Sequence, residues 1–333
     1  MAAAGLPLVA ELRAGGGREV RLDVPQLGIA ERVSWAEIAA YTQAARVAWE
    51  AYAAAPSADA FSRVRGDDSA HLVKVALGET WEELGGEVPP GLHLLLRSEL
   101  PLGSGFGSSA AAAVAIVQGL LAWLGEAAPR ERVLRLALEA ERRQHGKPSG
   151  IDTTTVVYGG VLALRRVGTK LVVDPVVASP TGLLSRLRIY GTGTPAEATG
   201  AVVAAVAEWG ASHPERFAAV LDEIEGATQH LRTELERDRE DAAVTLDALR
   251  ACHRGLQELG VVPAPVAAVV AAVEAAGGAG KISGAGAATG SGGGTLLVYH
   301  PHPEALETQP ELARLPRYRA PLGAPGVAIE EVP

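Results

Sequence analysis

The stretch GSGFGSSAAAA, residues 103–113, places three glycines, three serines and four alanines in eleven positions. It follows a strand candidate at 91–101 and opens a helix candidate at 108–125 that is apolar on most of its surface. Glycine at every second position lets backbone N–H groups converge on an anion, and the start of a helix favours negative charge. This order predicts a phosphate-binding loop, with a plain turn and a serine N-cap as the structural alternative.

Two common phosphate-binding motifs do not fit this loop. A Walker A loop needs a lysine after its last glycine, where this chain has Ser108. The dinucleotide fingerprint spaces its glycines differently and needs an acidic residue at the end of a following strand, whereas a long helix follows here. The loop by itself therefore indicates a phosphate group without identifying the molecule that carries it.

A second group of candidate residues lies in EAERRQHGKPSGID, residues 139–152. Glu139 and Glu141 stand near the C-terminal end of a predicted helix, where the helix dipole disfavours a carboxylate unless a cation compensates it. Asp152 follows a Gly-Lys-Pro-Ser-Gly turn. One interpretation is a glutamate that binds Mg²⁺ and an aspartate beside an acceptor hydroxyl. The other is a helix cap and a solvated helix face.

The composition restricts the class of protein. A chain of 333 residues suffices for one large or two moderate domains. Its net charge of −9 argues against a nucleic-acid partner, and Cys252, the only cysteine, excludes an internal disulfide and fits a reducing compartment. The first residues lack a signal-peptide pattern, and no apolar run is long enough to span a membrane. We therefore expect a cytoplasmic protein with no membrane partner.

Strand and helix candidates alternate irregularly, which predicts an α+β fold with two lobes instead of a regular Rossmann sheet. We place the lobes at 1–183, which carries the phosphate loop, and 184–333, because ASPTG interrupts the pattern near this boundary. The other predicted elements are strands at 7–13 and 18–24 joined by a glycine turn, helices over 35–55, 59–84, 130–146 and 195–276, a short helical turn after 152, a hairpin around Gly168, strands at 187–193 and within 281–300, and tail strands near 317–322 and 326–332.

Four short motifs stand in a fixed order in the chain. They are PLGSGFGSSAA (101–111), ERRQHGKPSGID (141–152), GTGTPAEATGAVV (191–203) and KISGAGAATGSGGG (281–294). The first resembles the PxxxGLGSSAA motif of the GHMP kinase superfamily, with Phe106 in place of the usual leucine. The second resembles E…HGxPSGxD of the mevalonate kinase branch, the third resembles a stretch of that branch, and the fourth resembles the superfamily's KxxGAGxGG.

This resemblance implies a two-lobed GHMP kinase fold, with an N-terminal lobe like ribosomal protein S5 and a ferredoxin-like C-terminal lobe. It implies ATP and Mg²⁺ as cofactors. Asp152 would be catalytic, accepting or orienting the proton of the acceptor hydroxyl, and Glu141 with Ser108 or Ser109 would bind the metal. The ATP phosphates would lie against Gly103, Ser104, Gly105, Phe106, Gly107, Ser108, Ser109 and Ala110, and the substrate near His145, Ser149, Gly150, Thr199, Gly284 and Ala285.

The activity that the resemblance implies is ATP-dependent phosphorylation of mevalonate to 5-phosphomevalonate in isoprenoid biosynthesis, in a protein that the family leads us to expect as a homodimer. The alternatives are a superfamily kinase or decarboxylase acting on phosphomevalonate, a mevalonate 3-phosphate type of substrate or a sugar, and a non-catalytic nucleotide-binding homologue. Mevalonate kinases begin with PxKxxLxGEHxVVxG, whose lysine assists the reacting hydroxyl. This sequence begins at what resembles the following segment, and its first lysine is Lys74. We expect either a truncated start or a mechanism without that lysine.

Overall fold

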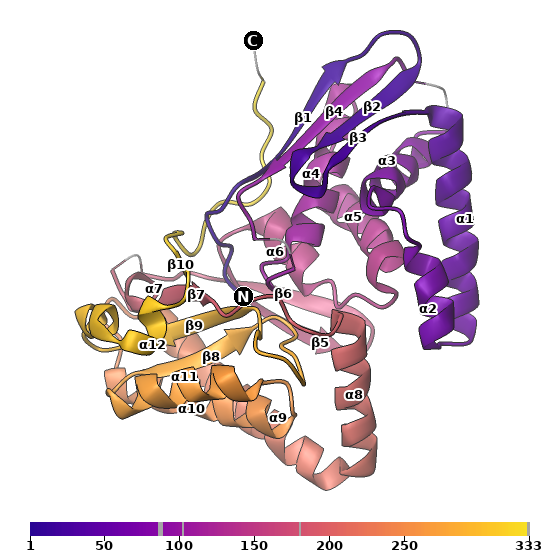
Figure 1. Ribbon diagram of the computed structural model, residues 1–333. Coiled ribbons are helices and arrows are strands. Elements are labelled where there is room, and N and C mark those ends of the chain that lie inside the picture. The colour runs from indigo at the N-terminus through magenta and orange to yellow at the C-terminus, as the bar shows by residue number, and fades with distance from the viewer. Residues whose placement is uncertain (86–88, 102, 180, 332–333) are drawn as a thin grey trace. The chain divides into compact units, whose positions relative to one another are not determined.

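The computed structural model describes residues 1–85, 89–101, 103–179 and 181–331 (Figure 1). The described residues form two compact units. The unit called here the amino-terminal unit holds Leu6–Leu100, Gly107–Gly159 and the residues from Pro325 on. The carboxy-terminal unit holds Met1–Gly5, Pro101–Phe106 and Gly160–Ala324. Both units combine helices with a sheet, which confirms the predicted α+β class.

The amino-terminal unit contains a four-stranded sheet in the order β1 (Leu8–Ala14), β4 (Leu92–Ser98), β2 (Glu19–Val24) and β3 (Ile29–Ser34). The glycine turn after β1 does not make β1 and β2 neighbours, because β4 lies between them, antiparallel to β1 and parallel to β2. The sequence of β4 explains its central place, since Leu92, Leu94 and Leu96 are all buried. Sequence analysis missed β3.

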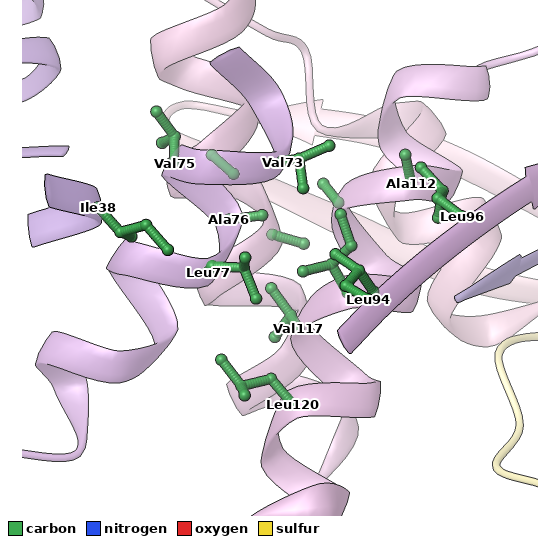
Figure 2. Close-up of a cluster of buried hydrophobic side chains, with 14 of the residues drawn as sticks. Ile38, Val73, Val75, Ala76, Leu77, Leu94, Leu96, Ala112, Val117 and Leu120 are labelled. Carbon is green, nitrogen blue, oxygen red and sulfur yellow. The ribbon is translucent and has the colours of Figure 1, made fainter. Parts of the chain in front are cut away.

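Helices pack against this sheet and enclose one large core. Figure 2 shows side chains of that core, including Ile38, Leu77, Leu94, Val117 and Leu120, which are all fully buried. The predicted helix over 59–84 is two helices, because Gly66 takes a φ of +58° and ends the first of them. The helices of the unit are α1 (Trp35–Ala54), α2 (Ala58–Arg65), α3 (His71–Glu83), α4 (Ser108–Trp123), α5 (Arg130–His145) and α6 (Ile151–Tyr158), with a 3₁₀ turn, η1, at Pro25–Leu27.

The carboxy-terminal unit contains the hairpin of β5 (Val161–Val167) and β6 (Lys170–Val176) and a second four-stranded sheet. The order of that sheet is β10 (Arg317–Tyr318), β7 (Arg188–Gly191), β9 (Thr295–Tyr299) and β8 (Ala279–Ser283), all antiparallel. The helices of the unit are α7 (Leu183–Arg186), α8 (Thr199–Ser212), α9 (Pro214–Leu235), α10 (Ala242–Glu258), α11 (Ala264–Ala275) and α12 (Pro310–Ala313), with a 3₁₀ segment, η2, at Pro303–Thr308.

The chain passes from one compact unit to the other between Gly159 and Gly160, because the β5–β6 hairpin packs within the carboxy-terminal unit. In that unit Leu162 exchanges two hydrogen bonds with Met1. The lobe boundary at 183 and 184 stays a prediction. The tail strand predicted near 317–322 is confirmed at Arg317–Tyr318 alone, and the one predicted near 326–332 is wrong, because 326–331 form no strand. Residue 332 lies outside the described residues.

Within the part of the chain that the structure describes, no helix has both the length and the apolar composition needed to cross a bilayer. The cytoplasmic location therefore stays a prediction.

Candidate functional site

The side chains of Ser109, Glu141 and His145 meet in the amino-terminal unit. Ser109 stands in the first turn of α4, while Glu141 and His145 are one turn apart at the end of α5. The Ser109 hydroxyl donates to Oε2 of Glu141 at 3.3 Å and lies 3.0 Å from Nε2 of His145. These two predicted site residues of α5 are thus joined to the phosphate loop by a single serine.

Glu141 is held in a largely dry environment. The residue is 4% exposed, and its Oε1 atom is buried without a hydrogen-bond partner among the described residues. The pKa of Glu141 is raised to about 7, mainly by burial; the hydrogen bond from Ser109 opposes the shift and the charge of Asp152 favours it. A buried carboxylate oxygen without a partner costs free energy unless a cation or a proton satisfies it.

Asp152 stands in the first turn of α6, where the sequence placed it. A methyl group added at Gly107 would lie 3.3 Å from Cβ and Cγ of Asp152, so the loop passes directly against this carboxylate. The side chain remains exposed to solvent, and desolvation by the surrounding protein still raises its pKa. Gly107 has a φ of +68°, which a larger residue would reach only with strain. The close approach and the backbone conformation both require glycine here.

The end of α5 is fixed by aromatic residues of α1. The indole N–H of Trp49 donates to the carbonyl oxygen of Gly146 at 2.7 Å, and the guanidinium of Arg143 lies 4.8 Å from the Trp49 ring centre. A methyl group at Gly146 would lie 2.6 Å from Cε1 of Tyr52. These contacts hold the turn that follows His145 at the end of α5. Sequence analysis assigned Trp49 no such role, because its partner is 97 residues away.

Arg65 brings a positive charge to the same end of α5. Phe61 packs against Gly146, and Arg65 follows Phe61 by one helical turn on the same face of α2. Burial lowers the pKa of His145, and together with the smaller effect of the Arg65 charge it brings that pKa to about 4. Arg65 is exposed and, within the described ranges, has no ion-pair partner. Nothing in the sequence pattern pointed to this residue.

The first half of the glycine loop belongs to the carboxy-terminal unit. The hydroxyl of Thr295 donates to the carbonyl oxygen of Ser104 at 2.6 Å. A methyl group at Gly105 would lie 2.9 Å from the carbonyl oxygen of Ser283, and one at Gly284 would lie 3.1 Å from Cα of Gly105. Two of the predicted glycine motifs, PLGSGFGSSAA and KISGAGAATGSGGG, therefore touch each other.

The remaining predicted site residues take the following positions. Gly103 has a φ of +67°, and Ala110 is fully buried inside α4. Ser149 accepts a hydrogen bond from the backbone N–H of Ile151, which gives it a local role at the start of α6. No hydrogen bond joins Thr199 to another predicted site residue among those described. The rest are Ser108 in the first turn of α4, Phe106 beside Tyr318, Gly150 just before α6, and Ala285 partly buried in the loop after β8.

The residues around Glu141 fit a magnesium ion. No group of three or more His, Cys, Asp or Glu side chains gathers as a metal cluster in the described part of the chain. Mg²⁺ does not need such a cluster, because it prefers one or two carboxylates and takes its other ligands from water and substrate phosphates. The unpaired Oε1 of Glu141 and the Ser109 hydroxyl supply oxygen ligands of this kind. Of the two serines, only Ser109 is hydrogen-bonded to Glu141 among the residues described.

Residues 71–160 match the model of the GHMP kinases N terminal domain. This segment contains α3, β4, α4, α5 and α6, and therefore Ser109, Glu141, His145 and Asp152. Residues 71–160 are thus similar to the N-terminal domain of GHMP kinases, and the resemblance that the motifs indicated is confirmed.

The particular relatives are mevalonate kinases. The chain is 45% identical over 73 residues to mevalonate kinase of Aeropyrum pernix, covering 22% of each chain. It is 30% identical over 211 residues to mevalonate kinase of Archaeoglobus fulgidus, covering 62% of this chain and 65% of the other. The matched segments thus span less than two thirds of these relatives' own lengths. A homoserine kinase is also among the relatives.

A solved structure confirms the fold over nearly the whole chain. A crystal structure of mevalonate kinase superimposes with a TM-score of 0.72 at 17% identity, covering 96% of this chain and 91% of the other. At this identity the likeness describes the fold alone. The predicted GHMP kinase fold is therefore confirmed.

Proposed function

We propose that this protein is a small-molecule kinase that transfers a phosphoryl group from ATP to a hydroxyl group of its substrate. The observation that carries the proposal is the buried Glu141, whose Oε1 lacks a partner while its Oε2 accepts from Ser109 at the start of α4. A helix N-terminus beside a carboxylate that can hold Mg²⁺ is suited to bind a nucleotide with its metal. When bound, Mg²⁺ neutralises charge on the phosphates.

The chain's own residues divide the work of phosphoryl transfer. Backbone N–H groups of residues 103–109 bind the ATP phosphates and orient them. Ser109 and Glu141 hold the metal, and Asp152, beside Gly107, accepts or orients the proton of the acceptor hydroxyl. Such a site acts through positioning and electrostatics, without covalent chemistry on the protein.

The acceptor that we propose is mevalonate, giving 5-phosphomevalonate as in isoprenoid biosynthesis. Two observations support it: the chain is similar to mevalonate kinases, at 45% identity over 73 residues and at 30% over 211 residues, and Arg65 offers an unpaired positive charge one turn from the contact with Gly146. A guanidinium at the end of α5 suits an acceptor that carries a carboxylate. It gives no advantage to a neutral sugar. Homoserine also carries a carboxylate and is the alternative acceptor that the relatives suggest.

An acceptor panel tests the proposal. ADP release is measured with ATP and Mg²⁺ and with mevalonate, phosphomevalonate, homoserine or galactose as the acceptor. We expect turnover with mevalonate well above that with the other three. Brisk turnover with homoserine alone would mean that the protein is a kinase whose acceptor is homoserine and not mevalonate. Tight ATP binding without turnover on any acceptor would contradict the kinase assignment.

A further inference from the structure

A hollow lies in the carboxy-terminal unit, and none of the residues assigned above lines it. Its volume is about 610 Å³, and it is bordered by α7, β7 and β10, which lie side by side in Figure 1. Its wall combines three arginines, Arg188, Arg317 and Arg319, with the apolar side chains of Leu184 and Ile189. The hollow therefore offers a cationic side and an apolar side to one small molecule.

The charge balance of the hollow is opposite to that of the protein. The chain carries a net charge of −9, yet three guanidinium groups face one carboxylate, Glu307, in the lining. Arg317 pairs with Glu307 at 3.2 Å, and Arg188 donates to the carbonyl oxygens of the neighbouring turn at 2.8 and 3.0 Å. Arg319 is exposed and has no ion pair within the described residues. Two positive charges thus remain without a carboxylate.

The hollow is connected to the glycine loop by two aromatic rings. Tyr318, which lines the hollow, packs edge-on against Phe106, with ring centres 5.1 Å apart and planes at 85°. A methyl group at Gly191 would lie 2.8 Å from the Tyr318 hydroxyl, so the ring has little room to move toward β7. A ligand that displaces Tyr318 must therefore act on Phe106, where this sequence departs from the leucine of the GHMP motif.

From these contacts we propose that the hollow is a second binding site for a small organic phosphate, whose occupation alters nucleotide binding at the loop through Tyr318 and Phe106. The phosphate group meets Arg319 and Arg188, because guanidinium groups match phosphate oxygens in charge and geometry. The carbon skeleton packs on Leu184 and Ile189. The binding is independent of the proposed kinase function, whereas its effect on nucleotide affinity rests on the loop being the nucleotide site.

The first experiment measures binding alone by calorimetric titration of the whole chain with butyl phosphate, in the presence of saturating Mg²⁺ and a non-hydrolysable ATP analogue. R319E should weaken this binding at least about tenfold, the cost of one charge-assisted hydrogen bond. R314E is the matched control, an exposed arginine that does not line the hollow, and should bind like the wild type. Equal affinity in R319E and the wild type, or binding that the ATP analogue abolishes, would overturn the site.

Two further ligands and one variant complete the test. Butanol should not bind, and inorganic phosphate should bind more weakly than butyl phosphate, because each lacks one half of the ligand. The affinity for the ATP analogue is then measured with and without butyl phosphate. The factor by which butyl phosphate changes the affinity for the analogue must equal the factor by which the analogue changes the affinity for butyl phosphate. F106L should keep butyl phosphate binding and lose this mutual effect. An unchanged effect in F106L would overturn the connection through the rings.

Discussion

The hydroxyl of Ser109 lies 3.3 Å from Oε2 of Glu141, so the start of α4 and the end of α5 share one hydrogen bond. The same hydroxyl lies 3.0 Å from Nε2 of His145. Thirty-two residues of sequence separate Ser109 from Glu141. The pair exists because α4 and α5 pack along their lengths in the amino-terminal unit.

This geometry predicts different roles in Mg²⁺ binding for the two serines Ser108 and Ser109. S109A should raise the Mg²⁺ concentration for half-maximal ADP release at least about tenfold, because it removes an oxygen ligand of the ion. S108A should have the smaller effect, since only Ser109 is bonded to Glu141 among the described residues. The measurement is a magnesium titration of both variants at saturating ATP. A larger effect in S108A would assign the ligand to the other serine.

Glu141 predicts a pH dependence of stability. Its pKa is about 7 in the folded protein against an unperturbed value of 4.5, so the folded state holds more protons between these limits. The free energy of unfolding contributed by this group is therefore highest below pH 4.5 and falls as the pH rises toward 7. Gln does not titrate, so the stability of E141Q relative to the wild type should rise across this window by about 3 kcal/mol.

Urea unfolding at pH 4.5, 6 and 8 measures this difference. Unfolding is followed by tryptophan fluorescence, and both proteins carry W209F. Trp209 lies in the carboxy-terminal unit and the other four tryptophans lie in the amino-terminal unit, so the signal then reports on the unit that holds Glu141. A difference between E141Q and the wild type that stays constant with pH would contradict the raised pKa.

Replacement of Asp152 should reduce the rate of turnover. D152N keeps the size of the side chain but removes the group that accepts or orients the acceptor proton, so kcat should fall by about 10²- to 10⁴-fold. The KM for ATP should change little. D59N, on exposed α2, is the control. Initial rates of ADP release give both constants, and a kcat near that of the wild type would remove Asp152 from the mechanism.

Arg65 predicts recognition of the acceptor carboxylate. R65Q should raise the KM for mevalonate about tenfold or more and leave the KM for ATP unchanged, because a charge-assisted hydrogen bond is lost. R63Q, on the same helix, removes an arginine that pairs with Asp59 and should match the wild type. The neutral analogue 3-methylpentane-1,3,5-triol should lose the same factor in the wild type and nothing further in R65Q. An equal loss with the neutral analogue in the wild type and in R65Q would mean that another residue recognises the carboxylate.

Among the substitutions proposed, one in the hydrophobic core should have the largest effect on stability. Leu77 is fully buried among the side chains in Figure 2, and L77A should lower the free energy of unfolding by about 2–5 kcal/mol through lost burial and a cavity. V47A removes two methyl groups from a side chain that is 56% exposed on α1 and should cost far less. Denaturant midpoints of the two variants check this. Similar values would mean that the core relaxes around the missing side chain.

Local sequence determined much of the candidate site. The alternation of glycine and small residues in 103–109, the helix that follows and the position of Asp152 after a glycine turn are properties of short segments. The structure accordingly has α4 beginning at Ser108, α5 ending at His145 and α6 beginning at Ile151. Helix boundaries of this kind depend on neighbouring residues, which is why the sequence could predict them.

Only the tertiary structure decided which of these segments touch. The insertion of β4 between β1 and β2, the choice of Ser109 over Ser108 beside Glu141, the contact of Trp49 with Gly146 and the place of Arg65 all join residues far apart in the chain. Such contacts follow from the packing of whole helices and strands around one core, and no local pattern encodes that packing. The sequence by itself determined a glycine-rich loop before a helix and the acidic candidates that follow it; the fold alone decided which side chains surround them.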